Sequence, residues 1–352
     1  MSATQPINTA LCSFGMSGLL FHAPFIATNP LFNLYAVLER TKNAASEKYP
    51  GIKTYRDLDE MLADGAIELV IVNTPNITHF DFTKRALQSG KHVIVEKPFC
   101  VTTQECKELI DLAASKKLKL SVYQNRRYDS DFRTVKKILE RNILGDLSEM
   151  EIHYDRFVKE LSYKTHKETG DTGTGGLYDL GSHLIDQALQ LFGMPEEVFA
   201  DIRIIRPGSK VDDYFDLILY YPTVRVKLKS SYLVREPLVG YMIHGSAGSF
   251  IKPKTNIQEL ALMQGFLPTS QNWGTEPQSE SGLLHTQING IEVKEFVVSE
   301  KGNYADYYND MYKAIRNNSE LPVEAEDGMK VIKIIEAAFK SNNTRKVISI
   351  NN

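Results

Sequence analysis

The chain has 352 residues, 42% of them hydrophobic and 24% charged, so it is long enough for two globular domains. A formal net charge of −3 argues against a nucleic-acid partner, and three scattered cysteines are too few for a disulfide framework or a metal cluster. With no signal-peptide pattern and no apolar run near the roughly 20 residues that span a bilayer, we expect a cytoplasmic protein without a membrane partner.

The first third of the chain alternates short apolar runs with amphipathic stretches. The predicted strands are Thr9–Phe14, Leu34–Glu39, Leu69–Asn73, His92–Glu96 and Leu118–Gln124. One predicted helix spans Thr78–Ser89 and ends at Gly90, and another follows a capping-box pattern formed by Thr102 and Glu105. This alternation predicts βαβ units around a parallel sheet.

After about residue 145, strands follow one another with short connections. They are predicted at Glu149–Phe157, Val198–Ile205, Tyr214–Tyr221, Val224–Leu233 and Val239–His244. Residues 224–229 alternate apolar and basic side chains, which is typical of a sheet with one covered face. Lys252–Thr286 has little periodicity and is predicted to be irregular, whereas Ala305–Asn317 and a segment near Gly328–Ser341 are predicted helices. The pattern predicts an α+β domain with a mostly antiparallel sheet.

A glycine-containing turn follows the first predicted strand. It reads Ser13-Phe14-Gly15-Met16-Ser17-Gly18 and matches the dinucleotide fingerprint at its second and third glycines, with Ser13 in place of the first. Gly15 would let the backbone approach a pyrophosphate, and Gly18 would permit close packing of helix on strand. Alone, the pattern also fits a plain strand-to-helix turn.

Glu39 ends the second predicted strand about 20 residues after the glycines. A carboxylate there would accept hydrogen bonds from ribose hydroxyls and repel a 2′-phosphate, which favours NAD over NADP. Arg40 leaves NADP open, because an arginine can pair with a 2′-phosphate. The alternative for Glu39 is a solvated carboxylate.

Three other strand ends carry unusual polar residues. They are followed by Thr74-Pro75-Asn76 with His79, by Glu96-Lys97-Pro98, and by Gln124-Asn125-Arg126-Arg127. Open α/β sheets bind ligands at this edge, and lysine is rarely buried without a partner, so Lys97 is a candidate for chemistry beside a dinucleotide. Each segment could also be a polar loop, with Arg127 paired to Asp131 on a helix surface.

A glycine-rich segment at residues 173–176 leads into a predicted helix with Asp179, His183, Asp186 and Gln190 on one stripe. Periodicity favours a solvated face, but Gly181 is costly inside a helix and would leave room for a ligand between Asp179 and His183. Histidine suits the removal of a hydroxyl proton, Asp179 could orient it or hold a substrate hydroxyl, and Lys97 could stabilise an alkoxide. Zinc is the rival interpretation, but no third ligand has matching spacing, so we predict no metal.

Together these motifs resemble the glucose–fructose oxidoreductase/inositol dehydrogenase/rhizopine-catabolism (Gfo/Idh/MocA) oxidoreductases. The resemblance rests on the glycine turn, Thr74-Pro75-Asn76 with His79, Glu96-Lys97-Pro98, Asn125-Arg126-Arg127 and Asp179-x-Gly181-x-His183. Residues 21–25 and 123–132 look closest to the branch that contains scyllo-inositol dehydrogenases.

The resemblance implies a Rossmann dinucleotide-binding domain at residues 1–125 and a substrate-binding and oligomerisation domain at residues 126–352, with a large, mostly antiparallel open sheet. It implies NAD(P)-dependent oxidation or reduction of a CH–OH group in a sugar, inositol or related polyol, by a homodimer or homotetramer. Its catalytic residues fall on Lys97, Asp179 and His183. The expected cofactor contacts are Ser13, Gly15, Met16, Ser17, Gly18, Glu39, Arg40, Thr74, Pro75, Asn76, His79, Glu96, Lys97, Asn125 and Arg127.

Two alternatives to this enzyme stay open. One is a non-catalytic NAD(P)- or sugar-sensing regulator on the same fold. The presence of Lys97, Asp179 and His183 argues against it, since a sensor need not keep a base. The other is reduction of a non-sugar such as a tetrapyrrole, because fold does not fix function.

Overall fold

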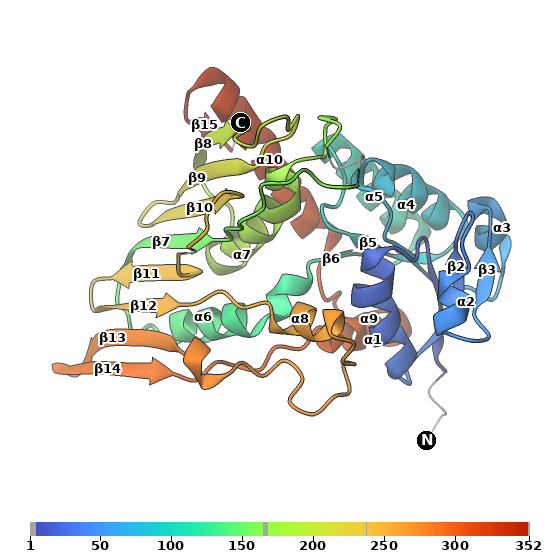
Figure 1. Ribbon diagram of the computed structural model, residues 1–352, viewed down its shortest axis with the longest axis horizontal. Helices are drawn as coiled ribbons and strands as arrows, with labels where there is room; N and C mark the ends of the chain where they lie inside the picture. The colour runs from blue at the N-terminus through green and yellow to red at the C-terminus, as the bar shows by residue number, and fades with distance from the viewer. Residues whose placement is uncertain (1–4, 165–167, 237, 351–352) are drawn as a thin grey trace. The chain divides into compact units, whose positions relative to one another are not determined.

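The computed structural model describes residues 5–164, 168–236 and 238–350 (Figure 1). They divide into two compact units. The first contains the residues up to 125 together with 258–273 and 303–329, and the second contains 126–257, 274–302 and the residues from 330 onward. Segments distant in sequence therefore complete each unit.

A six-stranded parallel sheet forms the centre of the first unit, in the order β3-β2-β1-β4-β5-β6. Its strands are β1 (Ile7–Leu11), β2 (Phe32–Leu38), β3 (Lys53–Tyr55), β4 (Leu69–Val72), β5 (His92–Glu96) and β6 (Leu120–Tyr123). All of β4 is fully buried, as expected for a parallel sheet covered on both faces. The strand order reverses between β1 and β4, the kind of position where open α/β sheets bind ligands. The predicted parallel sheet is confirmed.

The helices of the first unit include those that connect these strands and α9 from later in the chain. They are the π-helical turn η1 (Ser17–His22), α1 (Ala23–Thr28), α2 (Ala44–Lys48), α3 (Leu58–Ala63), the 3₁₀ turn η2 (Asn76–Thr78), α4 (His79–Gln88), α5 (Thr103–Lys116) and α9 (Ala305–Asn317). The predicted capping box is present, because Thr102 Oγ1 accepts from the Glu105 amide at 3.2 Å and Glu105 Oε2 accepts from the Thr102 amide at 3.3 Å. Gly90, after α4, has a φ of +78°, which suits glycine.

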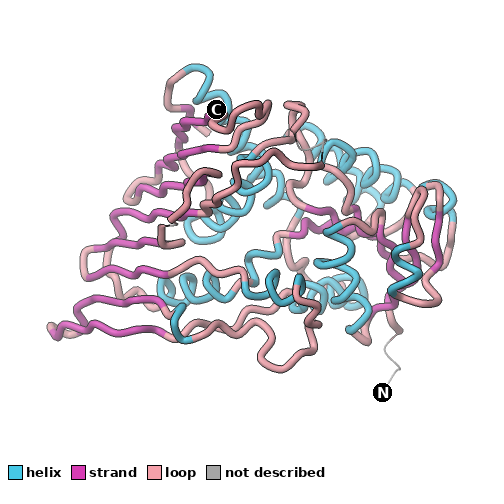
Figure 2. The backbone as a smooth tube through the Cα atoms, viewed as in Figure 1, coloured by secondary structure: helices cyan, strands magenta, loops and turns pink. Residues whose placement is uncertain are grey.

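The second unit contains a nine-stranded sheet in the order β14-β13-β12-β11-β7-β10-β9-β8-β15, drawn in magenta in Figure 2. Its strands are β7 (Leu147–His153), β8 (Glu197–Arg203), β9 (Tyr214–Tyr220), β10 (Arg225–Ser231), β11 (Tyr241–Gly245), β12 (Gly248–Lys252), β13 (Gly282–Ile288), β14 (Ile291–Val297) and β15 (Ile348–Ser349). β7 and β10 are parallel, and the other neighbouring strands are antiparallel. Val226 and Leu228 are fully buried while Arg225 is exposed, so the predicted one-sided sheet is confirmed.

The remaining helices are the 3₁₀ turn η3 (Asn125–Tyr128), α6 (Ser130–Glu140), the π-helical turn η5 (Leu177–Gly181), α7 (Ser182–Phe192), α8 (Ile257–Met263), the 3₁₀ turn η6 (Gln278–Glu280) and α10 (Ala325–Thr344). The prediction that Lys252–Thr286 is irregular is wrong in part, because the segment contains α8 and the start of β13. α8 buries just Gln258 and Leu262, too few apolar positions for a visible period. None of the helices in the described part of the chain has the length and apolar character to cross a membrane.

Candidate active site

The turn after β1 is held by a reciprocal clamp with Asn73, which follows β4. The Ser13 amide donates to Asn73 Oδ1 at 2.9 Å, and Asn73 Nδ2 donates to the Ser13 carbonyl at 2.9 Å. A Cβ built at Gly18 would lie 2.3 Å from that carbonyl oxygen, whereas one at Gly15 would meet its nearest neighbour, Ser13 Oγ, at 3.9 Å. Position 18 therefore tolerates only glycine, whereas a side chain at position 15 would meet no close neighbour.

The carboxylate of Glu39 lies at the start of α2 and is largely buried. Its Oε2 accepts from the Ala45 amide at 3.0 Å, so the predicted alternative of a solvated carboxylate is wrong. Arg40 is exposed, and Arg56 donates to the carbonyl oxygens of Glu39 and Lys42, each at 2.5 Å. The Glu39 carboxylate thus lies near three cations, Arg40 and Lys42 of the same loop and Arg56 from the segment after β3. A carboxylate repels a 2′-phosphate and a cation attracts it.

His79 links the segments that follow β4 and β5. Its Nε2 lies 2.9 Å from the Thr74 carbonyl oxygen, and its Nδ1 lies 2.9 Å from the Pro98 carbonyl oxygen. Burial lowers the pKa of His79, so a neutral ring donates to one carbonyl at a time. His79 therefore holds two strand ends together, and the cis peptide between Lys97 and Pro98 lies beside it.

Gln124 belongs to the polar segment after the last predicted strand of the parallel sheet, but it is not among the expected cofactor contacts. It follows β6, is 1% exposed, and both polar atoms of its side-chain amide are buried without a hydrogen-bond partner in the described structure. Such orphaned groups are rare in native proteins and are satisfied by water or a ligand. The available signal was its position directly after a buried strand.

In the second unit, Asp212 explains the glycine-rich segment before η5. Asp212 Oδ2 accepts from the Leu177 amide at 2.7 Å, and the Asp212 carbonyl accepts from the Gly176 amide at 2.7 Å. A Cβ at Gly175, where φ is +100°, would lie 2.0 Å from Asp212 Oδ1. Burial raises the pKa of Asp212 to about 6, although the Leu177 amide opposes the shift. The glycines thus make room for Asp212.

In the polar stripe that leads from η5 into α7, His183 and Asp186 are buried, at 5% and 2% exposed, and Asp179 and Gln190 are half-buried, so the solvated-face interpretation is wrong. Arg127 donates to both carboxylate oxygens of Asp186, at 2.8 and 2.6 Å, and not to Asp131 as the alternative proposed. Gly181 also differs from expectation. Its Cβ would lie 2.6 Å from Leu177 Cδ1, so this glycine permits internal packing and does not leave room for a ligand.

A cationic and aromatic cluster surrounds Asp179 in the same unit. The Arg156 guanidinium carbon lies 5.3 Å from the Tyr154 ring centre and 6.0 Å from that of Tyr232. Burial opposes the charge of Arg156, but Tyr154 and the Asp179 carboxylate raise its pKa, so it stays charged. This cluster could not be predicted from the sequence. An alternating pattern shows which side chains share a face of the sheet, but not which side chains of other segments lie beside them.

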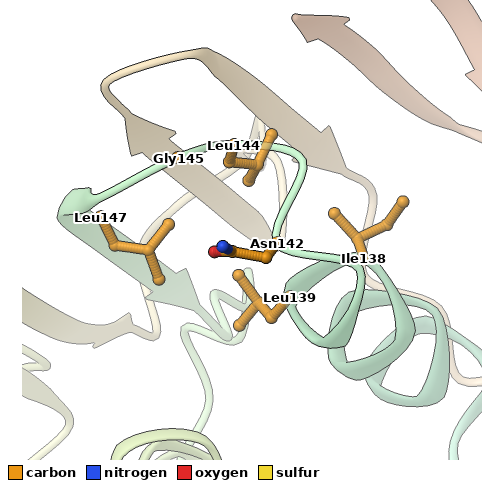
Figure 3. A pocket seen from close by; sticks show the side chains of 6 residues that line it. All are labelled: Ile138, Leu139, Asn142, Leu144, Gly145 and Leu147. Atoms are coloured by element: carbon orange, nitrogen blue, oxygen red, sulfur yellow. The ribbon is translucent and has the colours of Figure 1, made fainter. Parts of the chain in front are cut away.

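The hollow in Figure 3 lies in the second unit, between the end of α6 and the start of β7. Its lining residues are Ile138, Leu139, Asn142, Leu144, Gly145 and Leu147. None of the six is ionisable, so the hollow offers no acid or base. Within the described ranges, no three His, Cys, Asp or Glu side chains are grouped to hold a metal ion.

Two family models match the chain. Residues 7–124 match the oxidoreductase family's NAD-binding Rossmann fold, and residues 136–350 match its C-terminal alpha/beta domain, both of the Gfo/Idh/MocA group. An oxidoreductase of Schizosaccharomyces pombe is 40% identical over 98% of this chain and 100% of its own length. The Bacillus subtilis protein IolW, named scyllo-inositol 2-dehydrogenase (NADP(+)), is 37% identical over 98% of this chain and 96% of its own length.

Solved structures resemble the whole chain as well. An oxidoreductase from Bacteroides fragilis has 46% sequence identity and a TM-score of 0.90, over 98% of this chain and 100% of its own. The oxidoreductase YvaA from Bacillus subtilis has 36% identity and a TM-score of 0.94, over 98% and 99% of the two chains.

Proposed function

The chain belongs to the Gfo/Idh/MocA oxidoreductase family, and from this premise we propose that it is an NAD(P)-dependent dehydrogenase or reductase of a sugar, inositol or related polyol. The observation that carries the proposal is the buried polar stripe on α7, where His183 is 5% exposed, since burying such groups away from function is costly. The name of the relative IolW supports an inositol-like substrate.

We assign the chemistry to three side chains. In the oxidative direction His183 takes the hydroxyl proton as the carbinol carbon loses hydride and becomes a carbonyl carbon. The Lys97 ammonium donates to the reacting oxygen and stabilises its developing negative charge. Asp179 orients His183 or holds a neighbouring hydroxyl. When bound, a nicotinamide supplies the hydride acceptor, and reduction runs the same steps in reverse.

The residues that would hold the dinucleotide lie at the carboxyl edge of the parallel sheet. The open backbone at Gly15 would receive the pyrophosphate. Glu39 and Arg40 would set the preference between NAD and NADP, with Glu39 favouring NAD. Residues 1–125 and 126–352 are the proposed dinucleotide and substrate domains.

We propose that the enzyme is cytoplasmic and that it forms a homodimer or homotetramer. The oligomer is supported by the face of the nine-stranded sheet that carries Lys227 and Lys229. This face presents charges of both signs, because Lys227 Nζ lies 3.1 Å from Glu151 Oε1 and Lys229 Nζ lies 3.9 Å from Asp216 Oδ2. Such a face could pair with a second copy of itself. Light scattering of the purified protein tests this, and a monomer at micromolar concentration would contradict it.

The test of function is a panel of inositols, aldoses and sugar acids, each with NAD and with NADP, followed by nicotinamide absorbance. Turnover with a polyol class is expected, and His183→Ala should abolish it without loss of dinucleotide binding. Silence across the panel, with binding of the dinucleotide shown in the same samples, would favour a sensor that does not catalyse.

A further inference from the structure

Behind Lys97 lies a buried hydrogen-bond network that the proposed chemistry does not use. Its centre is the Glu96 carboxylate, and every member lies in the first unit. His22 Nε2 is 3.0 Å from Glu96 Oε1, and the side chains of His22 and Glu96 are 0% and 13% exposed. Ser17 Oγ donates to the same oxygen, and the Lys97 amide donates to Glu96 Oε2 at 3.1 Å.

The partners of Glu96 come from functionally distinct segments. Ser17 begins η1 in the turn that we assign to the pyrophosphate, His22 ends η1, and Lys97 follows β5. One carboxylate thus joins the backbone of the proposed catalytic lysine to both ends of η1. Burial opposes ionisation of Glu96, but the His22 hydrogen bond and the Ser17 and Lys97 contacts lower its pKa below the usual value.

The His22 ring is fixed from its other side as well. His22 Nδ1 lies 2.8 Å from the Tyr308 hydroxyl of α9, and the His22 and Tyr123 rings are 4.6 Å apart. The hydroxyls of Tyr308 and Tyr123 each lie 2.9 Å from the Phe21 carbonyl oxygen. An ionised carboxylate only accepts, so Nε2 carries the hydrogen that points at Glu96. The ring can neither rotate nor withdraw this donor without breaking several contacts.

We propose that His22 is a positioning residue, which acts through Glu96 to hold the Lys97 backbone and the Ser17 turn in one fixed relation. A fully satisfied buried network of this kind specifies a single geometry. The part of this inference that concerns turnover rests on the proposed function of Lys97. An apolar residue could fill the same space but could not orient Glu96.

The test compares His22→Leu, which removes the donor, with His22→Gln, whose amide nitrogen can replace Nε2. We expect His22→Leu to lower kcat by about tenfold or more while the substrate KM changes by less than about threefold, and His22→Gln to recover most of the loss. Tyr308→Phe keeps the ring packing, removes the contact at Nδ1 and should have the smaller effect. Glu96→Gln, of nearly the same shape, serves if His22→Leu does not fold, and should lower kcat likewise.

A second readout needs neither cofactor nor substrate. The acetylation rate of Lys97 by acetic anhydride, read by peptide mass spectrometry, is compared with that of Lys107, whose side chain is 64% exposed. His22→Leu should change the Lys97 rate relative to Lys107 by about threefold or more, and His22→Gln should restore it. Unchanged labelling in folded His22→Leu, or no recovery in His22→Gln, overturns the inference even if the wild type turns over. Changed and restored labelling without turnover on any substrate supports the positioning and counts against the proposed function alone.

Discussion

The two π-helical turns of this protein, η1 in the first unit and η5 in the second, look alike but are constrained differently. Each lies at the start of a helix, each contains a glycine, and each carries residues that we assign to the site. A Cβ at Gly18 would strike the Ser13 carbonyl oxygen at 2.3 Å, whereas one at Gly181 would meet the end of the Leu177 side chain at 2.6 Å. Backbone atoms cannot move aside as easily as the end of a leucine side chain, so η1 tolerates a side chain at its glycine less well than η5 does.

The two turns also differ in which of the proposed site residues they carry or contact. η1 stands behind Lys97 and contacts it through Glu96, while η5 carries Asp179 itself and leads to His183 one turn later. π-helical turns are frequent at functional sites because they re-aim side chains within a helix. We propose that η1 supports the dinucleotide-binding residues of the first unit and that η5 supports the substrate-binding residues of the second.

The largest expected effect is the loss of turnover when a proposed catalytic side chain is removed. Lys97→Met and His183→Ala should each lower kcat by about 10³-fold or more, because each removes a group that acts on the reacting oxygen or its proton. Dinucleotide affinity, measured by fluorescence titration, should stay within about threefold of the wild type in His183→Ala. Turnover retained in both variants would contradict the assignment.

Substitution of Gly18 and Gly181 by alanine tests whether the two turns differ in their tolerance of a side chain. Gly18→Ala should destabilise the protein by about 2 kcal/mol and abolish dinucleotide binding, because the turn must move away from Ser13. Gly181→Ala should change the free energy of unfolding by less than about 1 kcal/mol, since alanine favours helix and the Leu177 side chain can shift. Urea unfolding measures both, and equal losses would show that the turns are constrained alike.

Asp212, which holds the start of η5, should make stability depend on pH. Its folded pKa of about 6 exceeds the usual value of 3.8 for an aspartate, so its protonation favours the folded state. This contribution is complete below pH 3.8 and is lost as pH rises through about 6, by roughly 3 kcal/mol. Asp212→Asn should flatten the dependence between pH 4.5 and 7.5 in urea unfolding. An unchanged slope would remove Asp212 as its source.

The smallest expected effect concerns the choice of dinucleotide. Arg40→Ala should lower kcat/KM with NADP relative to NAD by about tenfold or less, because an exposed arginine contributes modestly to binding a 2′-phosphate. Glu39→Ala should shift the ratio towards NADP, with a loss of stability at the start of α2 as its side effect. The ratio of kcat/KM for the two dinucleotides measures both, and a shift in the opposite direction would contradict these roles.

Local patterns predicted the features that depend on nearby residues. The strand–helix alternation, the Thr102–Glu105 capping box and the bounds of α9 follow from periodicity and capping, and the structure has them. Short or exposed strands such as β3 and β14 were missed, because three residues carry no period and an exposed edge strand loses its apolar alternation.

The meaning of several site residues could not be predicted, because their partners are distant in sequence. Gly175 is required by Asp212, and Arg127 is paired with Asp186, 59 positions away. The unpaired side-chain amide of Gln124 can be recognised only when the atoms that surround it are known. The sequence suggested candidate residues at the strand ends, and tertiary packing determined what each one contacts.

The most direct test of the account is transfer of deuterium. Once the panel has identified a polyol substrate, the same polyol deuterated at the oxidised carbon is incubated with the enzyme and the dinucleotide. The mass of the reduced dinucleotide is then measured by mass spectrometry. We predict that the reduced dinucleotide carries the deuterium, and that His183→Ala forms none above background. Reduced dinucleotide without deuterium would contradict direct hydride transfer from the substrate carbon.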